Sequence, residues 1–433
     1  MKKLFAWVLG LLLVVFLCIL PGAPAWAQTL KLVGRDAGDG KMLAYMGRVK
    51  ALFERGHPGV TVEMNPVQST EQEYSNKSVL MMRTDASADV FVIDSFLLPS
   101  FVAAGYVAEI PVASWADWNT QFSDAVKRGT TIGGKVYAVP LSTDTRGLFY
   151  NLEAFRQAGL PTPWNPRTWA DVAAAARALK GKVDYPLWIN SSSSQGEATT
   201  MQTFEMLLSG TGSWLVEGDR WTVRTRGVAD SLGFLETLFV KDKIVEKRKL
   251  ATMMDSISWQ LAIELMAQGK IGIQLDGNWR GVDWARIPDY RNRVAVTPMP
   301  RQDGGGFTSM SGGWTIGVSS LSKNQGLAFE LVKVASGFDG DKAWALANGD
   351  MAVRKDVAAD PDYAGANYYR TQMSRYIEFT NFRPSSEVYP KISQLISLAV
   401  ESVVTGKASA VKAAETYDAQ VKKIAGPGHW VEP

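Results

Sequence analysis

The chain has 433 residues, with 46 basic and 43 acidic side chains mixed along its length and a formal net charge of +3. No basic block or stripe points to a nucleic-acid partner. The single cysteine, Cys18, lies in a segment expected to be removed, which excludes disulfides and cysteine metal sites from the rest. About 400 remaining residues exceed what one core usually fills, so we expect two domains.

Residues 1–27 have the pattern of a secretory signal. Lys2 and Lys3 precede an apolar run at 4–20, and a small-residue exit follows at 25–27. We therefore expect cleavage after Ala27 and an exported, periplasmic or extracytoplasmic protein. A retained membrane anchor is the alternative, and the helix-breaking residues at 21–22 argue against it. Lipidation of Cys18 is disfavoured because Leu17, not a small residue, precedes it.

The first 70 residues of the remaining chain predict a parallel α/β sheet. A strand at 30–34 is followed by a helix with Leu43, Met46, Val49, Leu52 and Phe53 at helical spacing, and then by an alternating strand at 60–64. Strand, helix and strand in about 35 residues are typical of parallel sheets.

A second buried strand at 89–95 ends in Asp94. In open α/β sheets, ligands bind at the carboxyl ends of the strands, so Asp94 is a candidate binding residue. The competing interpretation is that Asp94 caps the helix that begins near Leu97.

The stretch 136–155, VYAVPLSTDTRGLFYNLEAF, joins two apolar runs through a polar centre that holds Asp144 and Arg146. A strand that restarts without a loop predicts a crossing between two lobes. The two charged groups either contact a hydroxylated ligand at the seam or pair with each other in a solvated turn.

Beyond this crossing, Thr168 and Asp171 predict a capping box at the start of an Ala-rich helix. A strand at 187–189 gives way to a polar loop with Gln195 and Glu197, and a helix is expected at 199–208. Another strand, at 270–275, leads directly to Trp279. The segment 293–300 has the pattern of a second crossing.

The last third contains a Gly-Gly approach to a strand, Gly312-Gly313-Trp314, which suggests close passage of backbone to a ligand or to neighbouring chain. Arg383 precedes Pro384 and a helix that is expected to have Ile392, Leu395, Ile396, Ala399, Val400 and Val403 on one stripe. A last amphipathic helix is expected from about Ser409 to Ile424.

In this order, the pieces resemble the extracellular solute-binding proteins of ABC importers, above all the sugar-binding family that includes the maltose- and trehalose-binding proteins. The pieces that carry the resemblance are HPGVTVEM, ADVFVIDSFLLPSFVAAGYVAEI, GKVYAVPLSTDTRGLFYNLEAF, TWADVAAAARALK, MAQGKIGIQLDGNW, SGGWTIGVSS and RPSSEVYPKISQLISLAVESVVTGKASAVKAA. The resemblance implies an α/β, two-lobed periplasmic-binding-protein type II fold with hinge crossings and a ligand cleft between the lobes.

The resemblance also implies a set of ligand-binding residues. They are Asp94, Asp144, Glu197, Trp279, Gly313, Trp314 and Arg383, with Arg35, Asp36, Ser69 and Thr70 in turns that often touch ligand. Acids and an arginine suit sugar hydroxyls, and tryptophan rings suit the C–H face of a sugar.

We accordingly expect a signal peptide at 1–27, lobe 1 at 28–143 and 299–360, and lobe 2 at 144–298 with C-terminal helices at 361–433. The expected function is capture of a disaccharide or glycosyl-polyol by hinge closure and its delivery to a membrane permease, by a monomer without cofactor, metal or catalysis. Trehalose, maltose, sucrose and glucosylglycerol remain open as ligands.

Three alternatives remain. Paired acids around a sugar also suit a secreted glycoside hydrolase, although the eight-unit pattern of a barrel is missing. Tyr368 and Tyr369 resemble the adjacent tyrosines of some iron binders, although core or surface packing explains them as well. A free-standing lectin without a transporter is the third.

Overall fold

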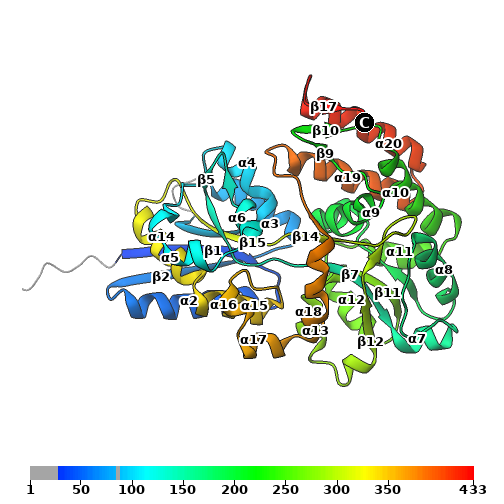
Figure 1. Ribbon diagram of the computed structural model, residues 1–433, viewed down its shortest axis with the longest axis horizontal. Coiled ribbons are helices and arrows are strands. Elements are labelled where there is room, and N and C mark those ends of the chain that lie inside the picture. Colours follow the sequence, from blue (N-terminus) through cyan, green and yellow to red (C-terminus); the bar gives the residue numbers. More distant parts are fainter. Residues whose placement is uncertain (1–27, 84–87) are drawn as a thin grey trace, which may run out of the picture.

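The computed structural model describes residues 28–83 and 88–433. The expected signal peptide, its cleavage site and Cys18 lie outside these residues. Figure 1 shows two α/β lobes side by side, with the early strands in one and the C-terminal helices on the other. In the described part of the chain, no helix has the length and apolar character needed to cross a bilayer.

Lobe 1 is built on a five-stranded sheet in the order β2-β1-β3-β15-β6. The strands are β1 (Gln28–Asp36), β2 (Val60–Gln68), β3 (Val90–Asp94), β6 (Ala138–Pro140) and β15 (Trp314–Val318). As the strand-helix-strand pattern predicted, β1 is parallel to both β2 and β3. β15 arrives from far along the chain and pairs antiparallel with β3 and β6.

Nine α-helices surround this sheet in the described part of lobe 1. They are α2 (Lys41–Gly56), α3 (Glu71–Met81), α4 (Leu98–Ala103), α5 (Ala116–Thr120), α6 (Asp124–Arg128), α14 (Gln325–Ala335), α15 (Phe338–Asn348), α16 (Lys355–Ala358) and α17 (Pro361–Ala366), with a small hairpin of β4 (Thr131–Ile132) and β5 (Lys135–Val136). In α2, Met46, Val49 and Phe53 are buried as expected, but Leu43 is 47% exposed. The buried stripe passes through Met42 and Tyr45 instead.

Lobe 2 has a four-stranded sheet in the order β12-β7-β11-β8. Its strands are β7 (Arg146–Asn151), β8 (Tyr185–Trp188), β11 (Ile271–Gly277) and β12 (Val294–Thr297). β7 is antiparallel to β11 and β12, whereas β11 is parallel to β8. All residues of β7, β8 and β11 are buried, which explains their nearly continuous apolar runs.

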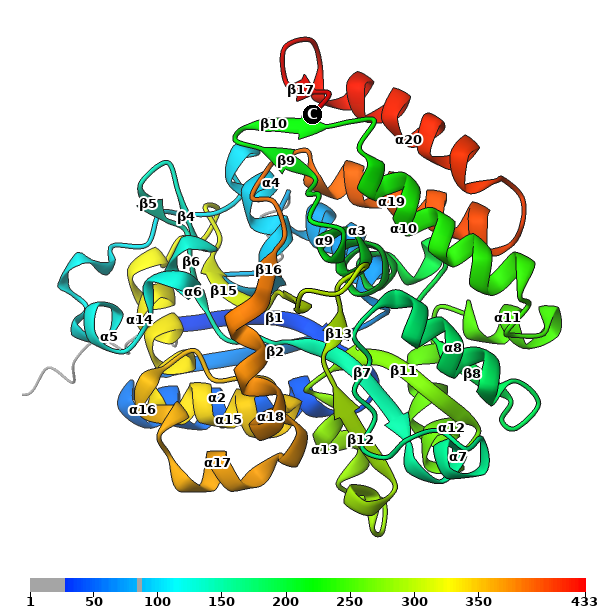
Figure 2. The same ribbon diagram turned by 45° about the vertical axis from the view of Figure 1, so that its right-hand side comes forward.

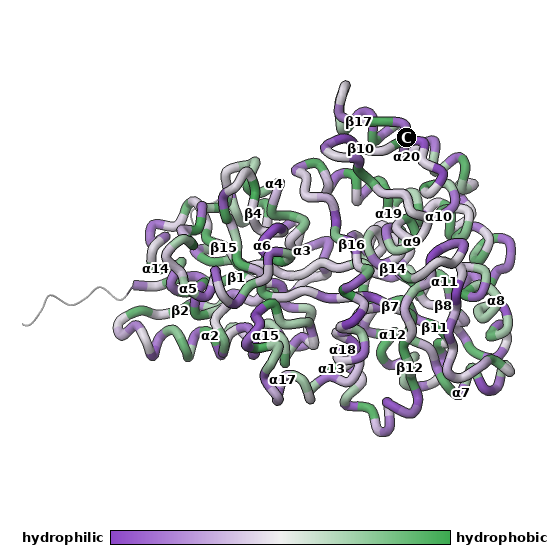
Figure 3. The backbone as a smooth tube through the Cα atoms, viewed as in Figure 1, coloured by the Kyte–Doolittle hydropathy of each residue, from purple (hydrophilic) through white to green (hydrophobic). Residues whose placement is uncertain are grey.

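Ten helices and a three-stranded ribbon surround this sheet in the described part of lobe 2. The helices are α7 (Leu152–Gln157), α8 (Trp169–Leu179), α9 (Met206–Gly210), α10 (Arg226–Glu236), α11 (Lys247–Met253), α12 (Ser258–Ala267), α13 (Arg280–Trp284), α18 (Tyr368–Met373), α19 (Tyr389–Val404) and α20 (Ala410–Ala425), and the ribbon contains β9 (Val216–Glu217), β10 (Arg220–Thr222) and β17 (Trp430–Val431). The predicted capping box of Thr168 and Asp171 begins α8. Figure 3 shows hydrophobic and hydrophilic residues mixed along the outer helices, as expected for helices with one buried face.

A third small sheet, β13-β14-β16, lies between the lobes. It contains β13 (Met299–Pro300), β14 (Phe307–Ser311) and β16 (Thr380–Phe382), and Figure 2 shows β16 descending between the two lobes. The chain passes between the lobes at 141–145, at 312–313 and at 367.

The predicted crossing at 293–300 is therefore wrong. Residues 294–297 form β12 and pair with β7 inside lobe 2, and the glycine loop at 304–306 only connects β13 to β14. Likewise, α17 packs on α15 and α16 of lobe 1. We propose the division into lobes with its later boundaries moved from 298 to 312 and from 360 to 367.

Candidate functional site

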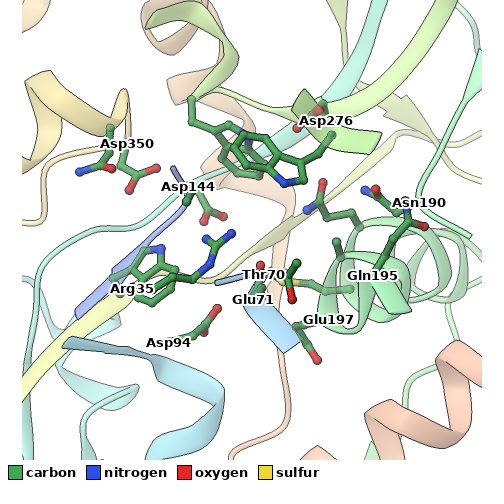
Figure 4. Close-up of a pocket in the computed structure, with 18 of the residues that line it drawn as sticks. Arg35, Thr70, Glu71, Asp94, Asp144, Asn190, Gln195, Glu197, Asp276 and Asp350 are labelled. Carbon is green, nitrogen blue, oxygen red and sulfur yellow. The ribbon is translucent and has the colours of Figure 1, made fainter. Parts of the chain in front are cut away.

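A cleft between the lobes holds a cavity of about 210 Å³. At about 10–15 Å³ for each water position, this space suits a ligand of one or two sugar rings. Seven acids, five cations and four tryptophans line it. Figure 4 shows Asp144 and Asp350 on one side and Asn190 and Gln195 on the opposite side. Of the residues predicted from sequence, Arg35, Thr70, Asp94, Asp144, Glu197, Trp279, Gly313, Trp314 and Arg383 line this cavity.

Arg383, which follows β16, joins acids from both lobes. Its guanidinium donates to Asp94 at the end of β3, to Ser95 Oγ at 3.1 Å and to Glu197 Oε1 at 3.3 Å. Only 4% of the Arg383 side chain is exposed. Asp94 also accepts from the backbone N–H of Phe96 at 3.3 Å, so both interpretations of Asp94 hold: it faces the cleft and it caps a helical turn.

Glu197 holds Arg383 in place from lobe 2. Its carboxylate accepts from the hydroxyls of Tyr389 and Ser393 on α19, in addition to Arg383. The Tyr389 hydroxyl also lies 2.8 Å from Glu205 Oε1, within hydrogen-bond distance. Glu197 precedes a π-helical segment, Ala198–Glu205, which continues as α9 where an ordinary helix was expected. The Glu197 carboxylate is thus occupied by protein groups.

Asp144 and Arg146 pair with each other at the first crossing, but they do so inside the protein and not in a solvated turn. Their side chains are 9% and 7% exposed. Asp144 also accepts from the backbone N–H of Gly312 at 3.0 Å, and the Arg146 guanidinium lies 4.9 Å from the ring centre of Trp279. Arg146 Nε is buried and has no hydrogen-bond partner among the described residues. A charged, partly unsatisfied group therefore faces the cavity beside a tryptophan.

The Gly312-Gly313 segment allows two backbone segments to pass close to each other. Gly313 has a φ of +146°, and a Cβ there would lie 2.0 Å from the carbonyl oxygen of Ser142. The two crossings pass each other here, and Trp314 N donates to Ser142 Oγ at 3.1 Å. Glycine is therefore required at position 313 because the backbone of the first crossing lies so close to it. The side chain of the next residue, Trp314, lines the cavity.

Two of the predicted residues do not line the cavity. Asp36 accepts from the backbone N–H of Gly38 at 2.6 Å and is 8% exposed, so it fixes the turn after β1. Ser69 donates to the carbonyl of Val67 at 3.1 Å, and its own carbonyl accepts from Arg35 Nε at 3.2 Å. Ser69 therefore positions the Arg35 side chain through its backbone carbonyl.

Lobe 2 contributes cavity residues that the sequence did not single out. Asn190, at 9% exposure, lies after β8, and its side-chain amide makes no hydrogen bond to another residue in the described ranges. In contrast, Gln195 accepts from the backbone N–H of Ser191 and Ser192 and donates to Ser258 Oγ, so its amide is committed to the loop. Asn190 directly follows the strand predicted at 187–189, and this position at a strand end is the sequence signal that could have identified it as a cavity residue.

Lobe 2 also contributes a buried arginine with two acids, of which Arg280 and Asp276 line the cavity. Arg280 donates to Asp276 at 2.7 Å and to Asp283 at 3.2 Å, with only 4% of its side chain exposed. The Arg280 guanidinium lies 5.6 Å from the ring centre of Trp259, which also lines the cavity.

Lobe 1 contributes Glu71 and Asp350, which the sequence analysis also missed. Burial, and then the charge of Asp94, raise the pKa of Glu71 to about 7. Burial, and then the charge of Asp144, raise the pKa of Asp350 to about 7. Asp350 Oδ2 accepts from Trp344 Nε1 at 2.9 Å. Each acid lies in a loop or first helical turn, where a single sequence gives no sign of burial.

Contacts across the mouth of the cleft hold the lobes together. Lys41 at the start of α2 lies 2.7 Å from Asp283 on α13, and Gln260 on α12 donates to the carbonyl of Ala37 at 3.0 Å. Both contacts join lobe 1 to lobe 2, so the described arrangement is a closed one.

No group of three or more His, Cys, Asp or Glu suited to a metal ion occurs in the described ranges. Tyr369, one of the two tyrosines considered for iron, is fully buried, and its hydroxyl donates to the carbonyl of Val294 at 2.8 Å. Tyr369 is therefore a core residue, and the iron alternative loses its basis.

Two lobes, three crossings and a polar, tryptophan-lined cleft between them define a two-lobed binding protein. The family model described as "Bacterial extracellular solute-binding protein" matches residues 39–363. The chain belongs to this family. The family name implies a location outside the cytoplasm.

Relatives of known name agree with this membership. The chain is 24% identical to the melibiose/raffinose/stachyose-binding protein MelE of Bacillus subtilis, over 86% of this chain and 85% of that protein. It is also 24% identical to a probable ABC transporter-binding protein of Deinococcus radiodurans, over 70% of this chain and 72% of the other.

Solved structures share the fold. A maltose-bound T. maritima MalE3 matches with a TM-score of 0.79 at 19% identity, over 91% of this chain and 99% of that one. A solute-binding protein of Thermotoga lettingae bound to α-D-tagatose matches with a TM-score of 0.76 at 22% identity, over 92% and 100%. The expected two-lobed α/β fold is confirmed.

Proposed function

We propose that this protein captures a carbohydrate of one or two rings between its lobes and delivers it to the permease of an ABC-type importer. The observation that carries the proposal is the composition of the cleft, where four tryptophans alternate with buried acids, arginines and the unpartnered amide of Asn190. Sugar hydroxyls suit the polar groups, and the apolar face of a sugar suits the rings. Relatives named for arabinooligosaccharides and for melibiose, raffinose and stachyose support the class of ligand.

The residues proposed to contact the ligand are those that combine exposure to the cavity with free hydrogen-bonding capacity or an open ring. They are Arg35, Thr70, Glu71, Asp94, Arg146, Asn190, Trp259, Trp279, Trp314 and Asp350. Glu197 and Arg383 hold this arrangement together across the lobes. We propose that the protein has no catalytic role and needs no cofactor. We also propose that it is a monomer, exported with cleavage of its signal peptide after Ala27.

Hinge closure is the proposed mechanism. A ligand that contacts both lobes stabilises the closed form in proportion to its preference for that form over the open one. Lys41 with Asp283 and Gln260 with Ala37 add protein contacts to the closed form. A permease would then recognise the closed, loaded protein.

Calorimetry of the secreted protein with trehalose, maltose, sucrose and glucosylglycerol tests the proposal. We expect saturable 1:1 binding of one of them. Asn190→Ala removes a ligand-facing amide without breaking a described hydrogen bond, and we expect it to weaken binding about three- to tenfold. The matched control is Asn292→Ala, which alters an exposed asparagine outside the cleft. A folded protein that binds none of these sugars contradicts the disaccharide proposal, and release of monosaccharides would favour the hydrolase.

A further inference from the structure

The charges that line the cleft do not all find partners. Arg383 pairs with Asp94 and Glu197, Arg146 with Asp144, and Arg280 with Asp276. Lys41 pairs with Asp39 and Asp283. Two lining acids, Glu71 and Asp350, then remain without an ion pair among the described residues. Among the lining cations, only Arg35 remains to compensate them.

Arg35 acts on Glu71, which leaves Asp350 as the lining acid without an ion-pair partner, although the charge of Lys41 acts on it from beyond salt-bridge distance. The charge of Arg35 lowers the pKa of Glu71, whereas it is not among the groups that act on Asp350. Asp350 is 6% exposed and has no salt-bridge partner within 4.0 Å among the described residues. A buried carboxylate without a counter-ion is costly, so a cation supplied by the ligand would relieve it.

Hydrogen bonds fix the direction of the Asp350 carboxyl, and the cavity ring of Trp314 carries no cation of the described residues. Trp344 Nε1 donates to Asp350 Oδ2 at 2.9 Å, and Ser142, which accepts from Trp314 N at 3.1 Å, also hydrogen-bonds to the Asp350 carboxyl. Among the cavity tryptophans, Arg146 lies against Trp279 and Arg280 against Trp259. In the described structure, no lysine or arginine lies over the ring of Trp314, which lines the cavity and packs against Trp344 with ring centres 6.2 Å apart, so no cation of the protein competes for this ring.

We propose that Asp350, together with the ring of Trp314, receives a protonated amino group of the bound sugar. The preferred solute is then an amino sugar or a glycoside with a basic nitrogen, and Trp344 is a positioning residue for Asp350. This inference rests on the proposed function and names the class of carbohydrate that the same cleft prefers. Figure 4 shows Asp350 beside Asp144 at the cavity wall.

The titration of Asp350 supports this assignment. The groups that act on Asp350 are Asp144, Trp344, Ser142 and Lys41, and the charge of Asp350 also acts on the guanidinium of Arg370, which donates to the Asp350 backbone carbonyl at 3.3 Å. With a pKa of about 7 in this closed arrangement, Asp350 is about half protonated at pH 7 when no ligand cation is present. An ammonium group favours the carboxylate form, so its binding releases a proton from the protonated fraction of Asp350.

The test compares sugars that differ in one group: D-glucosamine with D-glucose, trehalosamine with trehalose, and the chitosan disaccharide with cellobiose. At pH 7 we expect one amine to bind about tenfold or more tightly than its hydroxyl partner, with proton release detected by calorimetry in two buffers of different ionisation enthalpy. Asp350→Asn keeps the acceptor for Trp344 and is expected to reduce the preference to about twofold and abolish the proton release. Asp303→Asn, the same change in an exposed loop, should alter neither.

The outcomes separate the two proposals. If a neutral sugar binds as tightly as its amine, or if Asp350→Asn weakens both members of a pair equally, the amine site is overturned and the carbohydrate function stands. If no member of any pair binds to the folded protein, the carbohydrate function fails, and the inference fails with it.

Discussion

Arg383 donates to Asp94 across the boundary between the lobes. Arg383 follows β16 in the hinge region and Asp94 ends β3 in lobe 1, while Glu197 holds the same guanidinium from lobe 2 at 3.3 Å. Because these groups are almost fully buried, each depends on the others for compensation of its charge. The ion-pair cluster of Arg383, Asp94 and Glu197, called the node below, therefore links the integrity of the cleft to the closure of the lobes.

Replacing Arg383 with Met should leave the buried carboxylates of Asp94 and Glu197 without their counter-ion. We expect the free energy of unfolding to fall by about 3–5 kcal/mol, because an uncompensated buried charge is far costlier than a lost surface ion pair. Urea unfolding measures this loss. Arg156→Met is the matched control, since Arg156 pairs with Glu153 at 2.8 Å with both side chains more than half exposed, and it should cost at most about 1 kcal/mol. Equal effects would contradict the role of the node.

Trp279 should contribute to binding more than to folding. Its ring lines the cavity and packs against Arg146. We expect Trp279→Leu to weaken sugar binding about tenfold, because a stacked ring contributes about 0.5–1.5 kcal/mol beyond its buried area. Calorimetry gives the affinity, and urea unfolding shows whether the variant is folded. Unchanged affinity would remove Trp279 from the site.

Gly313 should tolerate no side chain. A Cβ there would lie 2.0 Å from the carbonyl oxygen of Ser142, and its φ of +146° disfavours other residues. We expect Gly313→Ala to lower the free energy of unfolding by about 2 kcal/mol or more. In contrast, Gly326 on α14 has open space around it, and Gly326→Ala should stabilise the protein by about 0.5–1 kcal/mol. Thermal unfolding of both variants decides the matter.

Glu205 should make the protein less stable as the pH rises. Burial, and then the charge of Glu197, raise the pKa of Glu205 to about 8, and its Oε2 has no partner among the described residues. The folded state thus holds a proton that the unfolded state releases near its ordinary pKa of 4.5. Stability from this group is complete below pH 4.5 and is lost progressively up to pH 8, by at most about 1.4 kcal/mol for each pH unit.

The test for Glu205 is urea unfolding of the ligand-free protein between pH 5 and pH 8. Glu205→Gln keeps a hydrogen-bonding partner beside the Tyr389 hydroxyl and removes the titration, so its stability should fall less steeply over this range than that of the wild type. Parallel pH profiles for the two proteins would show that Glu205 does not titrate as described.

Local patterns in the sequence determined much of the fold. The alternation and burial of β1, β2 and β3, the capping box at Thr168 and the amphipathic stripes of α19 and α20 follow from interactions between residues close in the chain. The crossing predicted within 136–155 lies between β6 and β7. It could be located because the abrupt change from apolar to polar residues is visible in the sequence without knowledge of which strands pair.

Only the tertiary structure decided which acids and rings face the cleft. Asp36 and Glu71 both lie in turns or helix starts, yet only Glu71 lines the cavity, and Asp350 gains its place from Trp344 and Ser142. The second crossing was misplaced for the same reason, since pairing of β12 with β7 joins residues more than a hundred positions apart. Sequence periodicity reports which face of an element is buried, whereas long-range pairing sets where that face points and which charges meet there.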